Sequence, residues 1–123
     1  MAENNVTTGY DGLNLPYSPE AEQAVLGAII IDSEIINEVA EILTDPRYFH
    51  VNTHRDIYAA VLDLYNNGKN IDFVTLLDRL TKEKNFDEST GKTYLMDLAQ
   101  NCPAVSNAKE YARIVREIGR AHV

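Results

Sequence analysis

The segment that most constrains this chain is LPYSPEAEQAVLGAIIID, residues 15–32, because no polar side chain occurs between Ala24 and Ile31. Its first half carries a helix start signal. Ser18 can cap a helix, and Pro19 suits the first helical position, where its missing N–H costs nothing. A helix that is apolar on every side has to be buried. We therefore expect a central helix that supplies four core residues: Val25, Leu26, Ile29 and Ile30.

A buried strand is the alternative for this segment, since Val25 and residues 29–31 are β-branched. The helix is favoured because the PEAEQA start is strongly helix-forming and nothing interrupts the pattern before Asp32. Gly27 lowers helix stability by about 1 kcal/mol relative to alanine. Its presence suggests that another helix packs closely against this one.

The rest of the chain repeats apolar residues at helical spacing and nowhere alternates with the period of a strand. Asp32 or Ser33 can cap a second helix, which the Asp-Pro pair at 45–46 ends, because a residue before proline is pushed out of helical conformation. Tyr48 and Phe49 are expected to fill a gap between helices. The sequence therefore predicts an all-α fold.

Four further helices follow from cap and stop signals. Thr53, with Asp56 three residues later, is the expected cap of the third helix, and residues 66–68 end it with types that tolerate left-handed backbone. Asp72 can cap the fourth, and residues 85–91 are predicted to be a loop. The fifth is expected over residues 94–101, ended by Pro103, and the sixth begins at Asn107. These signals predict one six-helix domain over residues 15–118, between a disordered arm at 1–14 and a tail at 119–123, natural or added.

The charge of the chain argues against a nucleic-acid surface. The chain has eleven Lys and Arg residues and nineteen Asp and Glu residues, which gives a net charge of −8. No basic residue precedes Arg47. Phosphate contacts need clustered basic residues, so we expect little or no direct DNA binding. One cysteine, Cys102, excludes an internal disulfide and is typical of a reducing, cytoplasmic setting. The longest apolar run is too short to span a membrane, and no signal peptide is evident.

Two segments resemble sites of chemistry, but both lack required parts. Thr90–Thr93 reads like the end of a phosphate-binding loop, yet Phe86 stands where that motif needs its first glycine. His50 and His54 are four residues apart, but the expected helix start falls between them and no third ligand lies nearby. Cys102 has no adjacent base to activate it. We expect no catalytic, cofactor-binding or metal-binding residue.

Three ordered blocks resemble the N-terminal domain of the bacterial replicative DNA helicases of the DnaB family. They are LPYSPEAEQAVLGAIIID, YFHVNTHRDIYAAVLDLYNNGKNIDFVTL and TYLMDLAQNCPAVSNAKEYARIVRE, together spanning about residues 15–117. The resemblance implies a non-catalytic collar domain that precedes a helical hairpin and an ATP- and Mg-dependent motor, in a hexameric 5′–3′ helicase. It also implies primase as a partner, with a helicase loader as a further candidate. Thr90 departs from the family's usual glycine, and the tail does not continue its helix.

The last helix is the candidate protein interface. Its apolar stripe is expected to be completed by the absent hairpin, so we expect a monomer in exchange with a weak dimer, and no hexamer. The interface residues we expect are Tyr94, Tyr111, Ile114, Val115 and Ile118. Docking of this stripe on the domain's own core stays open. So do two other functions: an acidic helical adaptor such as the helicase-binding domain of a primase, and a small nucleotide- or metal-dependent hydrolase.

Overall fold

The protein is all-α in the part that the computed structural model describes, residues 18–83 and 86–122. No strand occurs in these ranges. Three short 3₁₀ helices lie at Ser33–Ile35, Pro46–Tyr48 and Val105–Asn107. The α-helices are α1 (Pro19–Ile31), α2 (Ile36–Ile42), α3 (Asn52–Asn66), α4 (Phe73–Glu83), α5 (Glu88–Gln100) and α6 (Ala108–His122). The all-α, six-helix prediction is confirmed, whereas the predicted arm at 1–14 lies outside the described residues.

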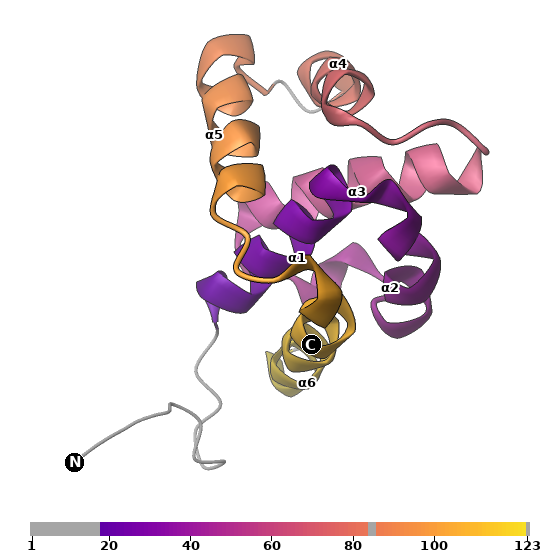
Figure 1. Cartoon of the computed structure of the whole chain (residues 1–123), viewed down its shortest axis with the longest axis vertical. Helices are drawn as coiled ribbons and strands as arrows, with labels where there is room; N and C mark the ends of the chain where they lie inside the picture. Colours follow the sequence, from indigo (N-terminus) through magenta and orange to yellow (C-terminus); the bar gives the residue numbers. More distant parts are fainter. Residues whose placement is uncertain (1–17, 84–85, 123) are drawn as a thin grey trace.

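Helix α1 is the centre of the domain (Figure 1) and packs most extensively against α6 and α5, with α3 also in contact. Val25, Leu26 and Ile29 are fully buried in this packing. Ile30 is only partly buried against the same cluster, and Ile31 is 50% exposed at the helix end. The apolar run is therefore longer than the stretch that the neighbouring helices cover.

The backbones of α1 and α5 approach each other closely at Gly27. A Cβ atom added to it would lie 2.1 Å from the backbone oxygen of Leu98 and 3.2 Å from the Cβ of Cys102. The expectation that a second helix packs closely at this glycine is confirmed. The helix-propensity cost of Gly27 is accepted because only a residue without a side chain lets the two backbones approach.

Several predicted caps are present in the structure. The Ser18 hydroxyl accepts a hydrogen bond from the Ala21 amide at 3.2 Å. Asp72 and Thr75 bind each other reciprocally at the start of α4, with the Thr75 amide 2.8 Å from Asp72 Oδ1 and the Asp72 amide 3.0 Å from Thr75 Oγ1. At the end of α3, Gly68 adopts a left-handed φ of 68°. These positions needed only local sequence signals.

Other boundaries differ from the prediction. Helix α3 begins at Asn52 and has no side-chain cap, so Thr53 lies inside it. Helix α5 begins at Glu88, because Asp87 caps it by accepting from the Thr90 amide at 2.8 Å. The loop predicted over residues 85–91 is therefore wrong from residue 88 onward. Gly91, at the end of the predicted loop, is helical and buried within α5.

The expected end of the domain at residue 118 is also wrong, because α6 runs on to His122. Gly119 is buried, and its Cα faces the backbone of Tyr48 so closely that a Cβ would lie 2.5 Å from that carbonyl oxygen. Phe49, next in the chain, is fully buried against Tyr58, and Tyr48 is partly buried. The turn at 46–49 thus fills the gap expected of it and also receives the last part of α6.

Candidate functional site

The predicted interface stripe on α6 faces the inside of the domain more than its surface. Val115 is 2% and Ile118 5% exposed, and α6 packs against both α1 and α2. Both residues are therefore part of the core, which contradicts their assignment to an interface. Tyr111 and Ile114 are partly buried and still reach the surface. The stripe was read correctly as apolar, but the helix that covers most of it belongs to this domain.

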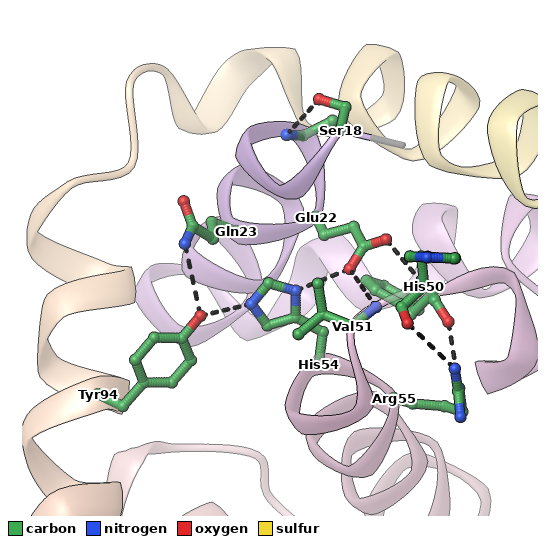
Figure 2. A network of polar contacts seen from close by, with 10 residues as sticks. Ser18, Glu22, Gln23, His50, Val51, His54, Arg55 and Tyr94 are labelled. Carbon is green, nitrogen blue, oxygen red and sulfur yellow. Dashed lines mark hydrogen bonds and ion pairs between the residues drawn. The ribbon is translucent and has the colours of Figure 1, made fainter. Parts of the chain in front are cut away.

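Tyr94, the remaining predicted interface residue, is partly buried, and Figure 2 shows its hydroxyl directed toward His54 and Gln23. Its hydroxyl is 2.5 Å from His54 Nε2 on α3 and accepts a hydrogen bond at 3.5 Å from Gln23 Nε2 on α1. The Tyr94 and His54 rings are stacked, with centroids 5.8 Å apart. Burial raises the pKa of the Tyr94 hydroxyl above its usual value. The side chain thus ties three helices together at one point.

Glu22 is the other end of this polar network, and it is 2% exposed. One carboxylate oxygen, Oε2, accepts the His50 amide at 2.7 Å. The other, Oε1, accepts the Val51 amide at 3.3 Å and lies 2.7 Å from His54 Nδ1. A carboxylate from α1 therefore holds the chain entering α3, where that helix has no cap of its own.

The direction of the hydrogen bond between His54 and Tyr94 depends on the tautomer of the imidazole. An ionised carboxylate can only accept, so His54 Nδ1 carries the hydrogen that it donates to Glu22. When the imidazole carries only that hydrogen, the other nitrogen, Nε2, is an acceptor and receives the Tyr94 hydroxyl hydrogen. Gln23 donates in turn to the Tyr94 oxygen. Every buried polar atom of this network is satisfied, and a chain of aligned hydrogen bonds stiffens each of its members.

The sequence carried a signal for this network that the prediction missed. Glu22 precedes Val25, Leu26 and Ile29 by three, four and seven residues, so it lies on their buried face of α1. His54 likewise precedes Ile57, which is fully buried, by three residues, so it lies on the buried face of α3. An ionisable residue on a buried stripe needs a partner. What the sequence could not state is that these two residues are the partners of each other.

Tyr94 forms a ridge between two surface hollows. One, of about 420 Å³, lies between the starts of α3 and α5 and includes Val51, Phe86 and Asp87. The other, of about 210 Å³, lies between α1 and α5 and includes Glu20 and Asp97. Tyr94 lines both. The surface beside the network is therefore concave on either side of one anchored aromatic ring.

The segments that resembled chemistry have other roles in the structure. Thr90–Thr93 lies within the first turns of α5, and the Asp87 carboxylate already occupies the Thr90 amide that a phosphate would need. His50 precedes α3 and His54 lies in its first turn, as the sequence indicated. Burial raises the pKa of the Cys102 thiol, which disfavours the reactive thiolate. Within the described ranges no three His, Cys, Asp or Glu side chains converge as metal ligands.

No helix among the described residues is both long and apolar enough to cross a membrane.

Comparison with known proteins gives a consistent result. A family model described as the DnaB-like helicase N-terminal domain matches residues 14–117. The chain is 39% identical over 102 residues to the replicative DNA helicase DnaB of Geobacillus stearothermophilus, a match that covers 83% of this chain and 22% of that protein. It is 38% identical over 102 residues to the replicative DNA helicase DnaC of Bacillus subtilis, again covering 83% of this chain and 22% of the relative.

Solved structures agree with this. The crystal structure of the N-terminal domain of DnaB helicase from Mycobacterium tuberculosis is similar with a TM-score of 0.79 and 34% identity, covering 88% of this chain and 78% of that one. A DnaB-like replicative helicase, described together with its interactions with primase, is similar with a TM-score of 0.73 and 28% identity. That match covers 85% of this chain and 24% of the other.

Proposed function

This chain belongs to the DnaB-like helicase N-terminal domain family, and we propose that it is the assembly and partner-binding part of a replicative DNA helicase. The observation that carries the proposal is the extent of the match. The chain resembles an isolated helicase N-terminal domain over 78% of that structure, but it spans only 22% of the curated relatives. ATP hydrolysis and DNA unwinding are therefore proposed for the region of a full-length helicase that this chain does not cover.

The chain itself is proposed to be non-catalytic, without a bound nucleotide or metal. In support, the segment with the nearest likeness to a phosphate-binding loop is helical and capped by Asp87. The buried Glu22–His54–Tyr94 network has every polar atom engaged within the protein. Such a network positions helices and leaves no group free to attack or protonate a substrate.

We propose primase as the principal partner, because a structural relative is described with its interactions with primase. A helicase loader is a further proposed partner. The net charge of −8 disfavours phosphate contacts, so direct DNA binding is proposed to be weak or absent. A cytoplasmic location is consistent with a single cysteine in the chain.

Self-association is proposed to be weak, giving a monomer in exchange with a dimer and no hexamer from this chain. The surface proposed for it is the exposed part of α6 around Tyr111 and Ile114. Replacing Ile114 by Asp should shift light scattering across a concentration series toward monomer without unfolding the domain. The matched control is Val74→Asp on α4, which is 71% exposed and should leave the exchange unchanged.

The primase proposal is tested by titrating the purified chain against fluorescently labelled cognate primase and following anisotropy. Saturable binding with one-to-one stoichiometry is the expected result, and an unrelated acidic protein of similar size is the control. A parallel assay should find no ATP turnover above buffer with or without Mg²⁺. Absence of saturable binding at concentrations up to about 100 μM, the weak end of transient protein association, would refute primase as the partner of this domain.

A further inference from the structure

The end of α3 places the one Asn-Gly pair of the sequence at the surface. Asn67 directly follows the helix, and Gly68 after it adopts a φ of 68°. The Gly68 amide donates to the Tyr65 carbonyl at 3.1 Å. The Lys69 amide donates to the Leu64 carbonyl at 2.9 Å. These two bonds form a Schellman ending, whose left-handed position favours glycine, so the way α3 ends explains why glycine follows asparagine here.

An asparagine that precedes glycine is chemically labile. The backbone nitrogen of Gly68 can attack the side-chain carbon Cγ of Asn67, which closes a cyclic imide and expels the side-chain nitrogen as ammonia, together with the amide proton. Water then opens the imide, returning a proton to the nitrogen and a hydroxyl to the carbon, and leaves aspartate or isoaspartate at position 67. A Cβ on the second residue hinders the attack, and glycine has none. Both residues are exposed, so water reaches them.

Asp63 holds the Asn67 side chain in an arrangement that opposes this reaction. Asn67 Nδ2 donates to the Asp63 carbonyl oxygen at 2.7 Å and to the Asp63 carboxylate oxygen Oδ1 at 3.1 Å. Both partners are acceptors, which fixes the orientation of the side-chain amide. The attacking nitrogen of Gly68 is engaged as well, with Tyr65. The reaction therefore needs the last turn of α3 to open, and helix ends open more readily than helix interiors.

We propose that Asn67 is a site of spontaneous deamidation, and that the Asp63 carboxylate slows the reaction by holding the last turn of α3 closed. The reaction consumes only water and needs no enzyme. The proposal is independent of the proposed function, because no partner protein takes part in it.

Deamidation would loosen the attachment of α3 to α4. The new carboxylate at position 67 would face the Asp63 carbonyl and carboxylate oxygens, which now accept from the amide of Asn67. It would also stand at the negative end of the dipole of α3. Opening of this turn displaces Asp63, whose Oδ2 is paired with Arg79 Nη1 on α4. Helix α4 packs mainly against α3 and α5, so this ion pair is one of its few anchors.

The rate is measured by incubating the purified chain in mildly alkaline buffer made with ¹⁸O-labelled water and mapping its peptides by mass spectrometry. Asn67 should gain the label faster than Asn70, an exposed asparagine that precedes the β-branched Ile71. Asp63→Ala should raise the rate at Asn67 about tenfold, the factor that one hydrogen bond to a charged group contributes to keeping the turn closed. The matched control, Arg79→Ala, breaks the ion pair with Asp63 but leaves both bonds to Asn67 in place, and should leave the rate unchanged.

Three results would overturn the inference. A rate at Asn67 no higher than at Asn70 would show that the Asn-Gly pair is not a modification site in this fold. An unchanged rate in Asp63→Ala would show that the carboxylate does not protect Asn67. Equal acceleration by Asp63→Ala and Arg79→Ala would show that the rate follows the ion pair between the helices instead. The melting temperatures of both variants serve as the folding control.

The structural consequence is tested separately with Asn67→Asp, which reproduces one product of the reaction. It should lower the melting temperature by about 4–8 °C, the shift expected for the loss of one hydrogen bond in a domain of about 100 residues. Asn70→Asp makes the same change of charge at an exposed position outside α3 and should leave the melting temperature unchanged. Equal melting temperatures of the two variants would show that a charge at position 67 does not loosen the end of α3.

Discussion

Replacing Glu22 by Gln tests the buried network with almost no change of shape. A glutamine in this position keeps one oxygen for the Val51 amide and His54 Nδ1. Its NH₂ group would replace Oε2, which accepts the His50 amide at 2.7 Å. Two donors would then face each other in a site where the side chain is 2% exposed.

The magnitude follows from what is lost. A hydrogen bond to a charged group contributes about 1.5–3 kcal/mol, and a buried donor left without an acceptor costs about 1–3 kcal/mol. The two values overlap because they describe the same amide, so we expect a loss of about 3 kcal/mol in the free energy of unfolding. For a domain whose total stability is about 5–15 kcal/mol, the loss is large.

Glu20→Gln is the matched control. Glu20 lies in the same first turn of α1 and has the same favourable interaction with the helix dipole, but its side chain is exposed. Its replacement should cost only the dipole contribution of about 0.3–1 kcal/mol. The assay is urea denaturation followed by circular dichroism, with the two midpoints compared at unchanged slope. If the two variants lose the same stability within about 1 kcal/mol, the carboxylate does not hold the entrance of α3 and the reasoning is refuted.

Three further outcomes can be measured. Gly27→Ala should lower the free energy of unfolding by about 1–3 kcal/mol in spite of its better helix propensity, because the new Cβ would meet the Leu98 carbonyl; an unchanged melting temperature would contradict this. Ile118→Asp should abolish the cooperative thermal transition, because it buries an unpaired charge. A variant that still folds would contradict the burial of Ile118 and support its assignment to the interface. Cys102 has a raised pKa, so its reaction with a disulfide reagent at pH 8 should be slower than that of a free thiol and should accelerate as pH rises; a faster reaction would contradict its burial.

Most of the fold was predictable because its signals are local. Ser18, the Asp72–Thr75 pair and Gly68 act within three residues along the chain, and each acts as its residue type predicts. The central helix was predictable because a run without polar side chains has only one stable place in a globular domain. The close packing of a second helix at Gly27 was also predictable, because a glycine inside a helix lets a neighbouring backbone approach.

The predicted site was less successful, and α6 shows why. Periodicity identifies which face of a helix is apolar, but it does not identify which neighbour covers that face. Val115 and Ile118 are buried inside this domain, where α6 packs against other helices of the same chain, whereas Tyr111 and Ile114 reach the surface. The distinction depends on how two helices far apart in the sequence cross each other.

The sequence by itself determined that this chain is helical, acidic and built on residues 19–31, because composition, spacing and caps act within one segment. Only the tertiary structure decided what its polar residues do. Glu22 could be read as a first-turn carboxylate and His54 as a solitary histidine, and each needed the other to be buried. A buried charge is stable only beside a partner, and residues 32 positions apart become partners only when the core brings their helices together.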